Sequence, residues 1–418
     1  MARLEIQGGQ RLSGRVRAAG AKNSVIKLMA ASILFEAPIT LTNVPHLRDV
    51  KTMASLLEHM GATCVWNGRE GLSIAAGSLA ETQAPYHLVR TMRASFNVLG
   101  PLIARYGQAE VSLPGGCAIG TRPVDQHLAG LAALGASVAI ESGYVRASAE
   151  HGLIGTDFSF DFPSVGATEH VLMAAVLAKG QTRLSGCARE PEIVDLAAFL
   201  NQAGARIRGA GTSEIEINGV GSLAPINYEV MSDRIEAATY LMAAIATGGE
   251  VAVDGLTVDH LPTVVELLRA TGVTVEKDKN AVAVSADAGA LTAQSFDTAP
   301  FPGFPTDLQA QMMVVNSLAS GRSHIRETIF ENRFMHVQEL VRMGANIKIN
   351  GNVALIEGVK ELNGAEVMAT DLRASVSLVL AGLIADKRTI VNRIYHLDRG
   401  YEFLERKLKR CNAEIKRI

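Results

Sequence analysis

The sequence predicts an α/β fold in which six copies of one repeat are grouped three by three into two closed domains. The repeat is visible because a Gly-Ala-like pair recurs at intervals of 68 to 74 residues. In each copy the pair follows an amphipathic segment and precedes an alternating one, the pattern of a helix that ends at a left-handed residue before a strand. The six pairs are Gly61-Ala62, Gly135-Ala136, Gly204-Ala205, Gly272-Val273, Gly344-Ala345 and Asn412-Ala413.

Each copy has the same order of elements. An Ala-, Leu- and Met-rich helix, apolar nearly all round and therefore expected to be buried, comes first. These helices are expected at 24–34, 93–104, 168–178, 235–246, 307–319 and 372–385. A short β-branched strand follows, at 39–44, 110–113, 182–184, 250–253, 324–328 and 389–391. An amphipathic helix such as 51–60 or 337–343 then leads to the Gly-Ala pair and to further strands such as 345–349 and 353–357.

The sixth copy ends at Ile418 without its last strands, and the N-terminus supplies a matching segment. Residues 3–14 read like residues 353–364, so residues 1–21 are expected to complete copy six. We therefore expect a first domain at 22–231 and a discontinuous second domain made of 1–21 and 232–418. A ligand cleft between two such domains is the default expectation. An open solenoid of six units is the alternative, but circular completion favours closed domains.

Composition limits the class of protein. A hydrophobic fraction of 48% over 418 residues is enough for two cores, and a net charge of −2 leaves no basic stripe for nucleic acid or a membrane surface. The N-terminus lacks a signal-peptide core, and no apolar stretch is long enough to span a bilayer. The four cysteines lie far apart and form no CxxC pair, which disfavours disulfides and zinc. We expect a monomeric cytoplasmic enzyme with no metal and no cofactor.

Charged residues recur at equivalent turns of the repeat. Turns before the buried helices and after the short strands contribute Lys22, Arg93, Asp307, Arg373, Glu190 and Arg399, among others. Helix N-termini offer free N–H groups and partial positive charge, so such a set favours a small molecule with several negative charges. Each charge could instead cap only its own helix. Residues 14–24 lack the order and spacing of a P-loop, and residues 209–211 lack the third glycine of a dinucleotide fingerprint.

A glycine-flanked loop carries Cys117. Pro114, Gly115, Gly116 and Gly120 make a strand or helix improbable there, and we expect a loop that acts as a lid. A neighbouring Arg122 would lower the pKa of a thiol and favour the thiolate. The alternative is an exposed cysteine without a role.

The motifs that join these features are specific. The sequence resembles the UDP-N-acetylglucosamine 1-carboxyvinyltransferase family, the enolpyruvyl transferases that open peptidoglycan synthesis and so serve cell-wall biogenesis, cell shape and division. The matching segments, which span the chain, are 20–24 (GAKNS), 91–95 (TMRAS), 113–117 (LPGGC), 122–125 (RPVD), 164–168 (SVGAT), 189–195 (REPEIVD), 302–307 (PGFPTD), 330–334 (FENRF), 369–374 (ATDLRA) and 396–401 (HLDRGY).

The resemblance implies a fold and a reaction. The fold is two inside-out α/β barrel domains of the enolpyruvate transferase type, with helices buried and sheets outside. The reaction adds the 3′-hydroxyl of UDP-N-acetylglucosamine to C2 of phosphoenolpyruvate and then eliminates phosphate from a tetrahedral intermediate.

The resemblance also implies roles for single residues. Cys117 is the acid that protonates C3 of phosphoenolpyruvate and can form an adduct with it, and it predicts sensitivity to fosfomycin. Asp307 is the base for the sugar hydroxyl, and Lys22 and Arg399 complete the catalytic set. Phosphoenolpyruvate would contact Lys22, Asn23, Arg122 and Arg399. The nucleotide sugar would contact Arg93, Arg122, Pro123, Val124, Asp125, Gln126, Ser164, Val165, Asp307 and Ile329. Second-tier candidates are His127 and Arg373, and Glu190 could tie the loop to the rest of the site.

Two segments depart from the family pattern. Residues 24–28 (SVIKL) replace a more Ala/Pro-rich run, and Phe162 stands near the place of a lysine, which puts nucleotide affinity in doubt but not the reaction.

Three other functions are less compatible with the sequence. A 3-phosphoshikimate 1-carboxyvinyltransferase would not need the Cys117 loop, an RNA-end cyclase-like protein would need a basic stripe and a catalytic histidine motif, and a nucleotide-sugar sensor would not need to retain Cys117.

Overall fold

The computed structural model describes residues 2–115 and 124–418. These residues divide into two compact units: a first unit of residues 20–115 and 124–231, and a second unit of residues 2–19 and 232–418. Each unit has its own apolar core, drawn from residues 25–230 in the first and from residues 4–18 and 235–415 in the second.

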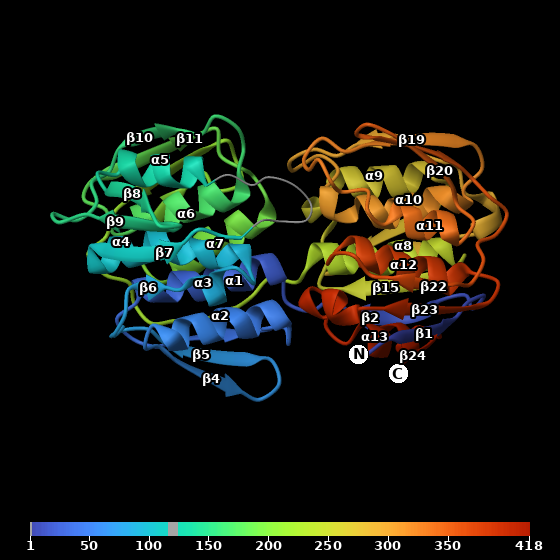
Figure 1. Ribbon diagram of the computed structural model, residues 1–418, viewed down its shortest axis with the longest axis horizontal. Coiled ribbons are helices and arrows are strands. Elements are labelled where there is room, and N and C mark those ends of the chain that lie inside the picture. Colours follow the sequence, from blue (N-terminus) through green and yellow to red (C-terminus); the bar gives the residue numbers. More distant parts are fainter. Residues whose placement is uncertain (1, 116–123) are drawn as a thin grey trace. The chain divides into compact units, whose positions relative to one another are not determined.

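The helices of the first unit can be followed in Figure 1. They are α1 (Lys22–Ala31), η1 (Ser32–Leu34), α2 (Arg48–His59), α3 (Tyr86–Val89), η2 (Arg93–Val98), α4 (Leu99–Tyr106), α5 (Asp125–Ala133), α6 (Val165–Ala175) and α7 (Pro191–Gln202). Those of the second unit are α8 (Arg234–Ala246), η3 (Val258–His260), α9 (Pro262–Ala270), η4 (Ala288–Ala290), η5 (Thr306–Leu308), α10 (Gln309–Leu318), α11 (Val337–Arg342), α12 (Ala374–Ile384), η6 (Ile394–Arg399) and α13 (Leu404–Arg410).

The described residues form six four-stranded sheets, three in each unit. The first unit holds the sheets β14-β3-β5-β4, β6-β7-β9-β8 and β10-β11-β13-β12, built from β3 (Ile39–Thr42), β4 (Thr63–Asn67), β5 (Gly71–Ala75), β6 (Gln83–Ala84), β7 (Gln108–Ser112), β8 (Ser137–Glu141), β9 (Tyr144–Ser148), β10 (Asp157–Ser159), β11 (Gln181–Ser185), β12 (Arg206–Arg208), β13 (Glu214–Asn218) and β14 (Asn227–Glu229). In each sheet one parallel pair is followed by antiparallel pairs, as in β6-β7-β9-β8.

The second unit repeats this arrangement with the sheets β16-β17-β15-β2, β18-β19-β21-β20 and β22-β23-β1-β24. Its strands are β1 (Leu4–Gln7), β2 (Ser13–Arg17), β15 (Glu250–Asp254), β16 (Thr274–Asp278), β17 (Ala281–Ser285), β18 (Phe296–Asp297), β19 (Arg322–Arg326), β20 (Asn346–Asn350), β21 (Val353–Glu357), β22 (Glu366–Met368), β23 (Arg388–Asn392) and β24 (Glu414–Arg417). The common order in all six sheets confirms the repeat that the sequence predicts.

The N-terminal strand closes the sixth copy. β1 pairs antiparallel with both β23 and β24, the position that β21 occupies between β19 and β20. In Figure 1 the blue β1 lies among the red strands of the C-terminal copy. The similarity of residues 3–14 to residues 353–364 therefore corresponds to an equivalent place in the sheet.

The central helices are enclosed by the sheets of their own unit. Every residue of α8 is buried, and α8, α10 and α12 pack against one another in the second unit. In the first unit α4 packs against α6 and against η1, the turn that follows α1. Helices inside and sheets outside is the inside-out arrangement that was expected, and the fold class is confirmed.

The predicted helix ends are also confirmed. Gly61, Gly135, Gly204, Gly272 and Gly344 have φ values of 103°, 92°, 102°, 95° and 96°. Asn412 takes the same left-handed region at 69°, which Asn tolerates better than most side chains.

Three helices differ from their predictions by a 3₁₀ turn. The helix expected at 24–34 ends as η1, and the helix expected at 307–319 begins as η5. The expected helix at 93–104 starts as the 3₁₀ helix η2, and the α-helix α4 starts only at Leu99. Pro101 gives the reason, since it lacks an N–H and its ring clashes with the carbonyl four residues earlier, so it is tolerated only in the first turn of an α-helix.

Candidate active site

Lys22 opens the first turn of α1 and is buried. Its Nζ lies 2.8 Å from Oδ2 of Asp49, in the first turn of α2, and the two side chains are 10% and 3% exposed. Asn23, the next residue of α1, is exposed. The buried carboxylate therefore holds the ammonium in one position at the start of a helix whose first turn carries no acidic residue.

A second group in the first unit gathers at the starts of α5 and α6. Val124 precedes α5, whose first three residues are Asp125, Gln126 and His127. The side chain of Gln126 accepts a hydrogen bond from the backbone N–H of Asp161 at 2.8 Å, so it joins the start of α5 to the loop before α6.

Ser164 is the N-cap of α6, and its hydroxyl accepts a hydrogen bond from the N–H of Ala167 at 3.4 Å. Val165 and Gly166 follow, and a Cβ built on Gly166 would lie 3.4 Å from the ring of His127. Arg93, half-buried at the start of η2, contributes positive charge that acts on His127. The structure thus brings together Arg93, Gln126, His127 and the amino end of α6.

Asp307 lies in η5, just before α10, in the second unit. Its Oδ1 accepts a hydrogen bond from Arg333 at 2.7 Å, and its Oδ2 lies 3.6 Å from Nε of Arg373. The arginine side chains are 5% and 4% exposed, whereas that of Asp307 is 26% exposed. Two buried guanidinium groups therefore orient a carboxylate that remains accessible.

Arg373 is anchored by several neighbours. It lies 3.7 Å from Asp233 and its guanidinium stands over the ring of Tyr401, 5.5 Å from the centroid. The hydroxyl of Tyr401 pairs in turn with Thr239 at 3.1 Å. Arg399, the last residue of η6, is partly exposed.

Sequence reasoning missed Glu327, which organises the surroundings of Asp307. Its carboxylate accepts hydrogen bonds from the hydroxyls of Thr298 and Thr306 and from the N–H groups of Ile329 and Phe330, at 2.8 to 3.2 Å. Glu327 is 3% exposed. The signal in the sequence is a glutamate directly after a short strand of alternating exposed and buried residues. One buried carboxylate thus fixes both the segment before Asp307 and the segment of Ile329.

Three predicted site residues, Cys117, Arg122 and Pro123, lie outside the described residues. Glu190, the N-cap residue of α7, is partly exposed. No group of three or more His, Cys, Asp or Glu side chains in residues 2–115 and 124–418 is arranged to hold a metal ion. In the same residues, no helix combines the length and the apolar character needed to cross a membrane.

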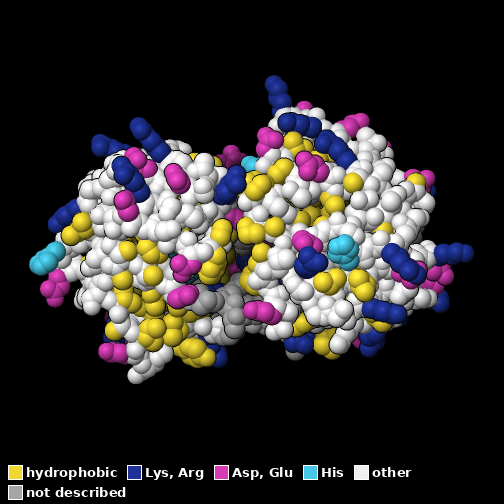
Figure 2. Space-filling model, turned by 90° about the horizontal axis from the view of Figure 1, so that it is seen from above, with side chains coloured by type: hydrophobic (Ala, Val, Ile, Leu, Met, Phe, Trp, Pro, Cys, Tyr) yellow, Lys and Arg dark blue, Asp and Glu magenta, His cyan; other side chains and the backbone are white. Residues whose placement is uncertain are grey.

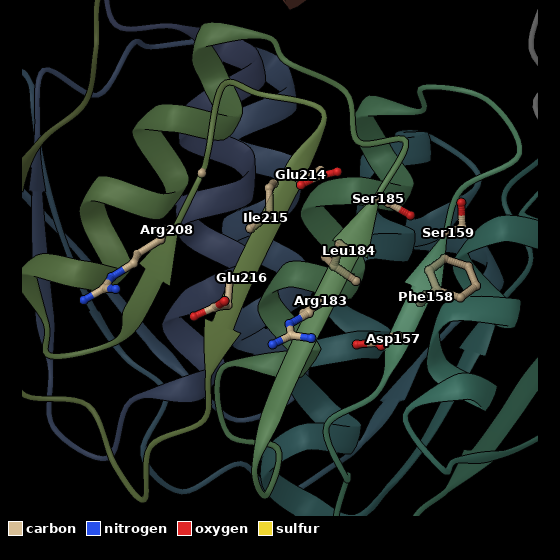
Figure 3. Close-up of a pocket in the computed structure, with 11 residues that line it drawn as sticks. Asp157, Phe158, Ser159, Arg183, Leu184, Ser185, Arg208, Glu214, Ile215 and Glu216 are labelled. Atoms are coloured by element: carbon tan, nitrogen blue, oxygen red, sulfur yellow. The ribbon is translucent and has the colours of Figure 1, made fainter.

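A shallow hollow of about 580 Å³ lies on one sheet of the first unit and contains none of the predicted site residues (Figure 3). It follows the outer side of β10-β11-β13-β12, where Asp157, Arg183, Glu216 and Arg208 are cross-strand neighbours. Alternating charges across neighbouring strands stabilise a solvated sheet surface. We therefore interpret the side chains in Figure 3 as the solvated face of a sheet and not as a binding site.

The surface in Figure 2 carries Lys and Arg side chains interspersed with Asp and Glu. Neither sign forms a continuous stripe on the described part of this face, in agreement with a net charge of −2. The surface shown therefore lacks the electrostatic footprint of a nucleic-acid-binding protein.

Comparison with known proteins defines the class. Residues 6–408 match the family described as EPSP synthase (3-phosphoshikimate 1-carboxyvinyltransferase). The structure of the enolpyruvyl transferase NikO from Streptomyces tendae superposes with a TM-score of 0.89 at 27% identity, over 100% of this chain and 99% of that chain. EPSP synthase from Acinetobacter baumannii has a TM-score of 0.77 at 18% identity over 100% of both chains, which shows the shared fold. The chain belongs to the EPSP synthase family of carboxyvinyl (enolpyruvyl) transferases.

Relatives at higher identity share one name within this family. A UDP-N-acetylglucosamine 1-carboxyvinyltransferase from Hyphomonas neptunium is 56% identical over 420 residues, covering 100% of this chain and 99% of the relative. Proteins of the same name from Maricaulis maris and Desulforapulum autotrophicum are 54% and 53% identical, over 100% of this chain and 99% and 100% of the relatives.

Proposed function

We propose that the protein transfers the enolpyruvyl group of phosphoenolpyruvate to the 3′-hydroxyl of UDP-N-acetylglucosamine and releases phosphate, the entry step of peptidoglycan synthesis. The observation that carries the proposal is the full-length identity of 53 to 56% to relatives named for this activity. The 3-phosphoshikimate enzyme, by contrast, is represented among the solved structures at 18% identity.

The reaction proceeds by addition and elimination. The sugar oxygen loses its proton to a base and bonds to C2 of phosphoenolpyruvate, while an acid delivers a proton to C3. The tetrahedral intermediate then loses a proton from C3, and the C2–O bond to phosphate breaks, which leaves a vinyl ether and inorganic phosphate.

We assign the base to Asp307 and the acid to Cys117. The accessible carboxylate of Asp307, oriented by Arg333 and Arg373, supports the first role. Cys117 is assigned from sequence alone. A thiol that donates its proton to carbon becomes a thiolate, and the positive charge of Arg122, close in the sequence, would stabilise this thiolate.

The anionic groups of the substrates are assigned to the cationic residues. Lys22, Asn23, Arg122 and Arg399 bind phosphoenolpyruvate, and the segments with Arg93, Val124–Gln126, Ser164–Val165 and Ile329 bind the nucleotide sugar. A preorganised cation placed beside the negative charge that develops on the substrate typically stabilises the transition state by about 3 kcal/mol. The buried contact of Lys22 with Asp49 supports such preorganisation.

The working state that we infer is a monomer in the cytoplasm, where both phosphorylated substrates are soluble. Sedimentation equilibrium of the purified chain measures the oligomeric state directly.

The test is release of inorganic phosphate from phosphoenolpyruvate with UDP-N-acetylglucosamine, with shikimate 3-phosphate, or with no acceptor. Of the three conditions, we expect phosphate release only when UDP-N-acetylglucosamine is the acceptor. The product should be heavier than UDP-N-acetylglucosamine by one enolpyruvyl group. Release that requires shikimate 3-phosphate, or no release with either acceptor, would refute the assignment.

A further inference from the structure

Two buried histidines from adjacent helices of the first unit contact one another. Nδ1 of His127 on α5 lies 3.1 Å from Nδ1 of His170 on α6, and the ring centroids are 5.0 Å apart. His170 is 0% exposed and His127 is 7% exposed. The mechanism above uses neither side chain.

The hydrogen bonds fix the tautomer of each ring. The backbone N–H of Gly100 points at Nε2 of His170 at 2.7 Å, so this nitrogen is an acceptor and carries no proton. A neutral imidazole has one proton, which in His170 must then be on Nδ1. That proton is donated to Nδ1 of His127, so the single proton of His127 lies on Nε2.

Burial keeps both rings neutral, and neighbouring positive charge adds to its effect. Burial, and to a smaller extent the positive charge of Lys27, lowers the pKa of His170 to about 3. Burial also places the pKa of His127 well below its ordinary value, with further contributions from His170, Lys27 and Arg93. Lys27 is itself paired with Glu169, the residue before His170.

The protonated edge of His127 faces the amino end of α6. The ring atoms Cε1 and Nε2 are those that a Cβ on Gly166 would approach to 3.4 Å. Ser164 and Val165, which stand directly before Gly166, belong to the segment assigned to the nucleotide sugar. A neutral N–H donor at this place complements the phosphate oxygens of a nucleoside diphosphate without adding a charge.

We propose that His170 is a positioning residue for the nucleotide-sugar substrate: it holds His127 in the tautomer whose Nε2–H donates a hydrogen bond at the amino end of α6. The identity of the ligand rests on the proposed function, whereas the tautomers do not. Lys27 acts further back, because its positive charge disfavours protonation of His170.

The tautomers can be read without substrate. In ¹⁵N-histidine-labelled protein at pH 7, two-bond ¹H–¹⁵N correlation spectra distinguish a protonated from an unprotonated ring nitrogen. We expect His127 to be protonated on Nε2 alone and His170 on Nδ1 alone. A proton on Nδ1 of His127, or an imidazolium at either position, would overturn the proposal and leave the proposed function intact.

The positioning role is tested with two variants of His170. In His170→Asn the amide nitrogen stands where Nδ1 stood and can still donate to His127, whereas His170→Leu fills a similar volume and cannot. We expect the leucine variant to raise KM for UDP-N-acetylglucosamine about tenfold, the effect of a lost hydrogen bond to a charged group, and to leave KM for phosphoenolpyruvate within about twofold.

The asparagine variant is expected to remain within about threefold of the parent for both substrates. A purely structural role would lower the melting temperature of both variants and would not separate the two KM values. Equal KM values for the nucleotide sugar in the two variants would therefore contradict the positioning role. If the leucine variant does not fold, the comparison of the asparagine variant with His127→Leu decides, since only loss of the donor itself should raise that KM.

Discussion

Oε2 of Glu327 accepts a hydrogen bond from the hydroxyl of Thr306 at 2.8 Å, and Thr306 directly precedes Asp307. The other oxygen accepts the N–H groups of Ile329 and Phe330 at 2.9 and 3.2 Å. Glu327 therefore acts on the candidate base and on a nucleotide-sugar segment through the backbone that carries them, without itself being exposed.

Replacing Glu327 with Gln should lower kcat/KM about tenfold to a hundredfold. Four groups donate hydrogen bonds to the carboxylate of Glu327. The amide of glutamine replaces one of the two accepting oxygens with an NH₂ group, so at least one of these four donors loses its acceptor. Steady-state kinetics measure the effect. Glu357→Gln, at an exposed side chain of β21, serves as the matched control, with less than a twofold change expected. Normal kinetics in Glu327→Gln would show that the position of Asp307 does not depend on this carboxylate.

Arg333→Lys should lower kcat about tenfold with a smaller change in either KM. Lysine keeps the charge but replaces the planar group that donates to Oδ1 of Asp307 at 2.7 Å, so the carboxylate loses its fixed orientation. Pre-steady-state phosphate release isolates this step from product dissociation. Arg322→Lys, in an exposed pair with Glu357, is the control; a KM effect with unchanged kcat would assign Arg333 to binding instead.

The sequence predicted the repeat, the buried helices and the left-handed helix ends because these depend on local pattern. Gly61 and Asn412 show this, since each can be recognised from its neighbours as the residue after an amphipathic helix. The start of α4 at Leu99 was less predictable, because the effect of Pro101 depends on how the preceding turn is formed.

The polar network inside the first unit was not predicted, because its partners are distant in sequence. Lys27 and Glu169 are 142 residues apart, and each lies on a helix whose sequence is mostly apolar. A single buried charge is unfavourable until its partner is placed, so only the tertiary structure explains it. Lys22 and Asp307, in contrast, stand at turns, where charged residues are recognisable as candidate site residues.

Lys27→Met should reduce the free energy of unfolding by about 3 kcal/mol, because it leaves the buried carboxyl of Glu169 without its partner. The double variant Lys27→Met/Glu169→Leu should recover most of this loss, since an apolar pair of similar volume removes both desolvation penalties. Urea unfolding measures the three proteins, with Arg322→Met as an exposed control that should change by less than about 1 kcal/mol. A double variant that is no more stable than Lys27→Met would contradict this account.

His170 should contribute a fall of about 1.4 kcal/mol to the free energy of unfolding between pH 7.5 and pH 5.5. An unfolded histidine binds a proton near pH 6.5, whereas burial lowers the pKa of folded His170 to about 3, so acid favours the unfolded chain across this interval.

The contribution of Glu169 to stability changes with pH in the opposite direction to that of His170. Burial raises the pKa of Glu169 to about 7, so its contribution to stability decreases as the pH rises from about 4.5 to 7. That contribution and the titration of His127 are expected to be similar in the parent and in His170→Asn, and therefore to cancel when the two proteins are compared. Urea unfolding at both pH values gives the change in the free energy of unfolding between pH 7.5 and pH 5.5. This change should be about 1.4 kcal/mol more favourable in His170→Asn than in the parent, because asparagine binds no proton in either state. Equal changes in the two proteins would mean that His170 is already protonated in the fold, which is incompatible with its acceptance of the Gly100 N–H at Nε2.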